Sequence, residues 1–294
     1  MSAAAAESPD SGGRHGLLGL RGLTRGLSPL VVVAFAVVSV AALAAVAGPQ
    51  IAPHSATAQD LSIGISGPSA NHWLGTDDLG RDVFSRTVVG ARTAVLGPLL
   101  VAFGAMLIGN LLGLLAGYKG GWFDTFVSRY ADLVYALPAL LVAIVIVGVV
   151  GGGYFVAVAL LLVLYSPVDT RLIRSATLVQ RAQPYVEAAR VTGVPARRIM
   201  IAHIWPNVLP LAVANAFLTF AFSIVSLASL SFLGLGVSPG TADWGRMLSD
   251  SRTLLFDNAW TALGPGIALV LTAASVNVVG DWLFERLVER GRVR

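Results

Sequence analysis

The sequence contains no cysteine and a single lysine among its 294 residues. Without cysteine there is no disulfide, no thiolate metal site and no thiol nucleophile. The lysine, Lys119, follows Tyr118 and not a glycine, so the Gly-Lys-Ser/Thr ending of a phosphate-binding loop is absent. The chain therefore cannot be a P-loop ATPase by itself, and any transport driven by ATP would need the nucleotide on another polypeptide.

Charge is also scarce. Charged residues make up 12% of the chain, while 55% of the residues are hydrophobic. This balance is typical of a polytopic membrane protein and excludes an ordinary soluble domain. A net charge of +4 would suggest nucleic acid binding in a soluble chain, but here the basic residues are better explained as determinants of membrane topology. We expect no nucleic acid partner.

Six apolar runs predict an all-α polytopic membrane protein with six transmembrane helices. These runs are Leu30 to Ala47, Thr93 to Tyr118, about Ala131 to Val150, Tyr154 to about Val168, Val208 to Leu235, and Trp260 to about Val279. The predicted segments are a tail 1–28, a first transmembrane helix 29–47, an outer segment 48–92, a core 93–282 with a loop 183–210, and a tail 283–294. Ala45-Val46-Ala47 imitates a signal-peptidase site, but the apolar run before it is longer than a signal peptide usually has. We therefore interpret the first run as an uncleaved span.

Basic residues predict the orientation of the spans. If both termini are cytoplasmic, 15 of the 20 lysine and arginine residues fall on the inner side and five on the outer side. The five outer residues are Arg81, Arg86, Arg92, Arg246 and Arg252. This bias follows the positive-inside rule and places the loop 183–210 in the cytoplasm.

The loop 183–210 is the one extended polar segment between long apolar runs. Pro184 and Pro195 suit first helical positions, and Gly193 suits the residue just past a helix end. The loop is therefore predicted to form a short helix from Tyr185 to Thr192, a tight turn, and a second helix from Pro195 to about Trp205. Pro206 is expected to end that second helix.

Two motifs resemble those of a known transporter family. Glu187-Ala188-Ala189, followed after three residues by Gly193, is similar to the EAA loop of the membrane subunits of ATP-binding-cassette (ABC) importers. The ending His203 to Asn207 and the outer segment Leu74 to Asp82 resemble the dipeptide and oligopeptide (peptide/nickel) branch of these permeases. Trp205 stands where that branch usually has leucine.

The resemblance implies a type I ABC importer permease fold, in which the EAA segment is a cytoplasmic coupling helix held in a cleft of the ATPase subunit. Small side chains would let that surface approach the backbone, while charged side chains pair at the rim. The alternative is an ordinary solvated loop between two spans. The residues expected to take part in coupling are Tyr185, Glu187, Ala188, Ala189, Arg190, Gly193, Arg197 and Arg198.

The resemblance also implies partners and a substrate class. The expected partners are a second homologous permease, two ATPase subunits that bind ATP and Mg²⁺, an extracytoplasmic solute-binding protein, and the lipid bilayer of a prokaryotic cytoplasmic membrane. The chain itself would bind no cofactor and catalyse no reaction, and the solute would be a di- or oligopeptide. One alternative is the import of nickel chelates or another small solute. A different class, an autonomous channel or secondary carrier, would usually need titratable groups in mid-membrane, and the predicted spans offer none.

Two helix faces stand out within the spans. Asn215, Thr219, Ser223, Ser226 and Ser229 share an arc of about 120° on the fifth span. Such a stripe either bonds to its own helix and its neighbours or lines a water-accessible path. In the second span, Gly109, Gly113 and Gly117 leave one face clear for close packing of another helix.

The outer segment contains a charged cluster of Asp77, Asp78, Arg81 and Asp82. These residues are candidates for docking the binding protein. Local turn chemistry is the alternative, with Asp77 or Asp78 capping a helix and Arg81 and Asp82 forming a surface pair. The acids lack the pattern of a calcium loop, so a cation site is the weaker alternative.

No metal or catalytic site is predicted. The histidines, His15, His54, His72 and His203, are scattered along the chain without metal-ligand spacing. Gly64 to Gly67 matches the short Gly-x-Ser-Gly motif of intramembrane serine proteases, but it lies in a polar loop and no predicted span contains a histidine.

Overall fold

A computed structural model describes residues 28–151 and 153–292 of the chain. The predicted tail 1–28 therefore lies, apart from Ser28, outside the described residues. The elements, in order, are α2 (Pro29–Ile51), α3 (Val83–Lys119), α4 (Gly121–Tyr135), α5 (Ala139–Val150), α6 (Tyr154–Arg181), α7 (Pro184–Val191), α8 (Ala196–Arg198), the π-helical turn η1 (Ile199–Ile204), α9 (Trp205–Phe232), α10 (Trp244–Asp250), the 3₁₀ turn η2 (Ser251–Thr253) and α11 (Trp260–Arg292).

The described part of the chain is helical. Its only extended pairing consists of two isolated bridges in the loop before α3, so the all-α prediction is confirmed. Five helical segments are long and apolar enough to cross a membrane, and the count reaches six if the bent pair α4 and α5 forms one span.

The third span differs from its prediction. A single helix from Ala131 to Val150 was expected, but α4 and α5 meet at an angle of 81°. Pro138 stands between them as the N-cap of α5, in an extended conformation. Proline fixes φ, disfavours helical geometry in the residue before it and has no N–H to continue a helix, which explains the break.

The fifth span also differs from its prediction. Pro206 was expected to end a separate helix, but it lies in the first turn of α9, and Ala196–Phe232 runs as one candidate span. A proline in the first turn costs no hydrogen bond, because the N–H groups there have no partner within the helix. The preceding turn η1 is π-helical, which lets the chain continue into α9: the N–H of Trp205 bonds to the carbonyl of Met200, five residues back.

The glycine face of α3 packs against α6, as the spacing predicted. A Cβ atom added at Gly113 would lie 2.8 Å from the carbonyl oxygen of Thr170, and one at Gly117 would lie 2.8 Å from that of Arg174. At Gly109 the added atom would lie 2.2 Å from the Cβ of Asp169. Only glycine allows the two backbones to come this close.

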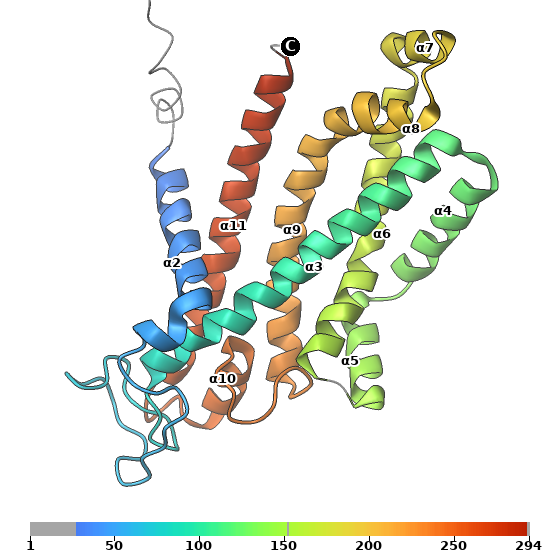
Figure 1. Ribbon diagram of the computed structural model, residues 1–294. Coiled ribbons are helices and arrows are strands. Elements are labelled where there is room, and N and C mark those ends of the chain that lie inside the picture. Colours follow the sequence, from blue (N-terminus) through green and yellow to red (C-terminus); the bar gives the residue numbers. More distant parts are fainter. Residues whose placement is uncertain (1–27, 152, 293–294) are drawn as a thin grey trace, which may run out of the picture.

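Figure 1 shows that the long helices run between two ends of the bundle. The C-terminal end of α11, the start of α2 and the short helix α7 lie at one end of the bundle. The loop between α2 and α3 and the helix α10 lie at the other end. This arrangement places the segment 183–210 on the same side as both ends of the described chain.

Candidate functional site

Helix α7, Pro184–Val191, begins and ends within one residue of the helix predicted from Tyr185 to Thr192. Gln183 precedes it in an extended conformation and Pro184 occupies its first turn. Gly193 follows it with a φ of 77°. The N–H of Gly193 bonds to the carbonyl of Arg190 (3.1 Å), and the N–H of Val194 bonds to that of Ala189 (3.0 Å). These two bonds form a Schellman motif, which explains the need for glycine at this position.

One face of α7 anchors it to the rest of the molecule. Val186 is fully buried and Ala189 is 9% exposed. Both pack in a small apolar cluster with residues of η1 and α9, namely Ile199, Ile204 and Val208. Since η1 and α9 form one continuous span, a displacement of α7 would be transmitted to the helix that crosses the membrane.

The other face of α7 is exposed. Glu187, Ala188, Arg190 and Val191 all face solvent, and Val191 is 80% exposed. The guanidinium of Arg190 lies 3.0 Å from the carboxylate of Glu187. A short helix with a small residue and an exposed valine between charged groups offers a surface for contact with another protein.

The other predicted coupling residues divide in the same way. Gly193, Arg197 and Arg198 are exposed around the turn after α7. Ala189 is turned inward and contributes to the apolar cluster. Tyr185 lies at the edge of the exposed face of α7, where it forms hydrogen bonds with neighbouring residues.

Tyr185 connects α7 to the segments on either side of it. Its hydroxyl donates to the side-chain oxygen of Gln180 (2.6 Å) and accepts from the amide of Asn207 (3.2 Å). The same amide donates to the carbonyl of His203 (2.6 Å). Partial burial raises the pKa of the Tyr185 hydroxyl above its ordinary value, so the group stays protonated and can donate. Sequence reasoning missed Gln180 and Asn207, because their link to Tyr185 depends on the fold.

The polar stripe of α9 has partners within the chain. Thr219 and Ser223 are buried, and the hydroxyl of Ser223 bonds to the Thr219 carbonyl (2.6 Å). The hydroxyl of Ser226 lies 2.7 Å from that of Tyr165 on α6. Ser229 bonds to its own helix at the carbonyl of Val225.

The remaining member of the stripe, Asn215, reveals a group that the sequence reading missed. Its amide donates to Oδ1 of Asp169 on α6 at 2.6 Å, and Asp169 is fully buried. The fourth span was predicted to end near Val168, so Asp169 was assigned to a loop. Because α6 continues to Arg181, this carboxyl group lies inside a helix that crosses the membrane.

The charged outer cluster is largely buried. Asp77 accepts hydrogen bonds from the backbone and from Nε of Arg81 (2.7 Å), and Nε of Arg86 lies 3.6 Å from the same carboxylate. Asp78 is exposed. The cap of α3 is Asp82, which accepts from the N–H of Ser85 at 2.7 Å. The expectation that Asp77 or Asp78 caps the helix was therefore wrong, as was a surface pair of Arg81 with Asp82.

The serine of the protease-like motif also has a structural role. The hydroxyl of Ser66 bonds to that of Thr76 (2.8 Å), and the Ser66 carbonyl accepts from the amide of Asn258 (3.1 Å). Asn258 also donates to the carbonyls of Leu74 and Thr76, so it fastens the loop before α3 to the segment before α11.

The helical bundle, with the exposed helix α7 at one end, is that of a polytopic α-helical membrane protein, and comparison with a solved transporter identifies it as the type I ABC importer permease fold. The MetNI methionine ABC transporter, solved in inward-facing conformations, has a chain of similar fold, with a TM-score of 0.58 and 20% identity. That match covers 68% of this chain and 95% of the other.

Similar sequences and a family model identify the protein family of the chain. It is 37% identical to the dipeptide transport permease DppC of Alkalihalophilus pseudofirmus, over 88% of this chain and 85% of the relative. It is 35% identical to the probable D,D-dipeptide permease DdpC of Escherichia coli, over 88% and 87%. The glutathione permease GsiD of Pectobacterium atrosepticum is 38% identical over 75% and 73%. The family model of binding-protein-dependent transport system inner membrane components matches residues 109–293, and the chain belongs to this family.

Proposed function

We propose that this chain is one of two permease subunits of an ATP-driven importer for di- or oligopeptides. The observation that carries the proposal is the surface of α7, which is exposed on one face and anchored to a membrane span on the other. The names of the relatives, which are permeases for dipeptides and glutathione, support the substrate class.

In the proposed mechanism, α7 docks on a cytoplasmic ATPase subunit through Glu187, Ala188, Arg190 and the turn at Gly193. ATP and Mg²⁺ bind to the ATPase pair, and closure of that pair displaces α7. The apolar contacts of Val186 and Ala189 pass this displacement to η1 and α9, which form one helical segment.

The remaining parts of the importer follow from this role. An extracytoplasmic binding protein would deliver the peptide at the end of the bundle that carries α10, where Asp78 is the exposed member of the charged cluster. The peptide would then pass between this chain and a second, homologous permease. Both termini are proposed to be cytoplasmic, since fifteen of the twenty basic residues then lie on the inner side.

The test is a charge reversal on α7 in the reconstituted complex. Glu187→Lys loses the pair with Arg190 and places a positive charge on the proposed docking surface. We expect peptide uptake to fall by about tenfold or more, as for the loss of a contact at the centre of an interface. ATP hydrolysis should no longer respond to the loaded binding protein. Gly193→Val should act in the same direction, because a β-branched residue at positive φ strains the turn that orients α7.

Glu289→Lys is the matched control. Glu289 is an exposed glutamate near the end of α11, and it pairs with an arginine three residues away, as Glu187 does. This variant makes the same charge change at the same end of the molecule and should leave uptake unchanged. Normal uptake by both Glu187→Lys and Gly193→Val would refute the coupling role, and uptake without any ATPase subunit would favour an autonomous channel or carrier.

A further inference from the structure

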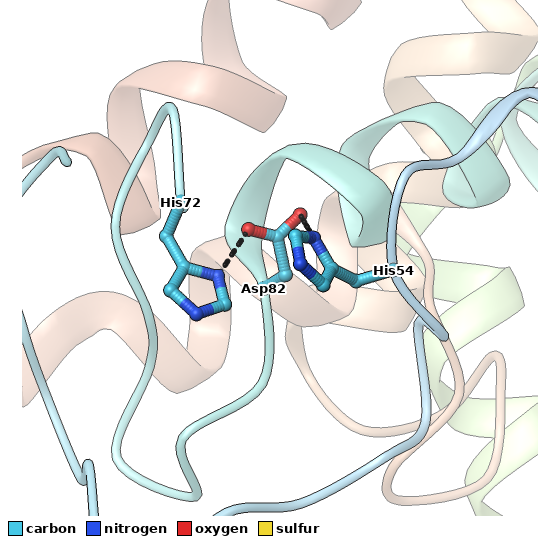
Figure 2. Close-up of side chains that lie close together, drawn as sticks. All are labelled: His54, His72 and Asp82. Atoms are coloured by element: carbon cyan, nitrogen blue, oxygen red, sulfur yellow. Dashed lines mark hydrogen bonds and ion pairs between the residues drawn. The ribbon is translucent and has the colours of Figure 1, made fainter. Parts of the chain in front are cut away.

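Two histidines and an aspartate that are distant in the sequence meet at the end of the molecule opposite α7. His54 follows α2, His72 lies in the long loop, and Asp82 caps α3. Figure 2 shows both imidazole rings directed toward the same carboxylate. Nδ1 of His72 lies 2.9 Å from Oδ1 of Asp82, and Nδ1 of His54 lies 3.9 Å from Oδ2. One ligand atom from each of the three residues lies within 4.8 Å of the other two.

This donor set suits a transition metal ion. Two imidazole nitrogens and a carboxylate oxygen are ligands that Zn²⁺ and its neighbours in the first row bind readily, and three protein ligands leave a coordination position for water. Binding requires that His72 carry its proton on Nε2 in place of Nδ1, because a neutral imidazole can hold it on either nitrogen. It also requires the ligand atoms, now up to 4.8 Å apart, to move closer together around the ion.

The carboxylate is held in place by the backbone. Asp82 is 3% exposed, and its Oδ2 accepts from the N–H of Ser85 at 2.7 Å. The hydroxyl of Ser85 in turn accepts from the N–H of His54 at 3.1 Å. These bonds fix Asp82 and the start of the His54 side chain, as outer-shell partners do for metal ligands.

Among the residues that the structure describes, no guanidinium pairs with the carboxylate of Asp82. Arg81 pairs with Asp77 and Asp78, and Arg86 pairs with Asp77. In the described part of the chain, the ion-pairing partners of Asp82 are the two histidines. The site is also accessible: the side chain of His54 is 43% exposed and that of His72 is 17% exposed, so an ion can enter from solvent.

We propose that His54, His72 and Asp82 bind a divalent transition metal ion, with Zn²⁺ the best match, and that the ion fastens the segment after α2 to the start of α3. This site is separate from α7 and does not depend on the proposed transport function. If the three side chains formed only a hydrogen-bonded support for the helix cap, they would bind no ion.

The test uses the full-length chain, purified in detergent without a polyhistidine tag and stripped with a chelator. Co²⁺ serves as the spectroscopic probe, since its visible absorption reports low-coordinate binding, and Zn²⁺ should displace it. We expect one equivalent to bind, and Zn²⁺ to raise the thermal unfolding temperature, because a ligand that binds only the folded state stabilises it.

Variants separate the site from other histidines. His54→Gln and His72→Gln should each weaken Co²⁺ binding by about tenfold or more, since changes even to the outer shell of a metal site have effects of this size. Asp82→Asn should weaken it too while preserving the helix cap, because asparagine caps as well as aspartate does. His203→Gln, at the other end of the molecule, is the control and should bind normally.

Two results would overturn the proposal. One is the absence of Co²⁺ and Zn²⁺ binding by the wild-type chain. The other is an affinity unchanged in a folded His54→Gln/His72→Gln double variant, which would mean adventitious binding elsewhere. Size-exclusion chromatography of each variant establishes that it is folded.

Discussion

The hydrogen bond between Asn215 and Asp169 provides the sharpest test of how α6 and α9 are held together. Asp169 is fully buried, and Oδ1 accepts from Asn215 at 2.6 Å. Its other oxygen has no hydrogen-bond partner among the described residues. The backbone of α3 passes close by at Gly109, where an added Cβ would lie 2.2 Å from the Cβ of Asp169.

Replacing Asn215 with leucine would leave the whole carboxyl group unsatisfied. Losing one partner of a buried polar pair costs about 1–3 kcal/mol, and more when the stranded group is charged. We therefore expect Asn215→Leu to lower the free energy of unfolding by about 3 kcal/mol. Asp169→Asn retains an acceptor oxygen for Asn215 and should cost less than about 1 kcal/mol.

The single variant Asp169→Leu and the double variant Asp169→Leu/Asn215→Leu complete a cycle with wild type and Asn215→Leu. Replacing both members of a buried polar pair by apolar groups is often nearly neutral. The double variant should therefore be more stable than Asn215→Leu alone, with a coupling energy of at least about 1 kcal/mol. Unfolding in mixed detergent micelles with increasing SDS, followed by circular dichroism, measures all four proteins. If Asn215→Leu were as stable as wild type and the two single changes were additive, the bond would not hold α6 to α9.

Two further predictions use features of the helix faces. Gly113→Leu should prevent folding, because even its Cβ would lie 2.8 Å from the Thr170 carbonyl and overpacking costs about 1–3 kcal/mol or more. The failure to fold would be seen as aggregation in size-exclusion chromatography, whereas the control Gly148→Leu, with no neighbouring atom within 4 Å, should fold. A monodisperse Gly113→Leu variant would contradict the close packing of α3 on α6. If the stripe of α9 lines the pathway, which is one of its two interpretations, Ser229→Cys in this cysteine-free chain should react with a water-soluble maleimide in one nucleotide state of the assembled importer and not in the other. Equal labelling in every state would count against that role.

Local patterns predicted much of the proposed coupling site. The short helix before Gly193, the positive φ at that glycine and the close face of α3 were all readable, because each depends on neighbours in the chain or on one helical repeat. Pro138 is visible in the sequence, but the sharp bend that it makes between α4 and α5 was not predicted. Pro206 was misjudged, since a proline ends a helix or begins one depending on the partners of the residues before it.

Contacts between distant segments were not readable from the sequence. His54, His72 and Asp82 are separated by ten or more residues, and only the path of the loop brings them together. Asp169 was assigned to a loop because hydropathy falls at that point, although the helix continues with its polar face toward α3 and α9.

The sequence by itself determined that this chain crosses a membrane several times, that it carries no nucleotide-binding loop, and that the short helix in its polar loop ends in a tight turn. These properties follow from composition, charge and local backbone preference. Only the tertiary structure decided which side chains of α7 face outward, which carboxyl group lies among the spans, and which histidines share an aspartate. Those outcomes depend on how whole helices pack, and packing pairs residues whose separation along the chain carries no information about their distance in space.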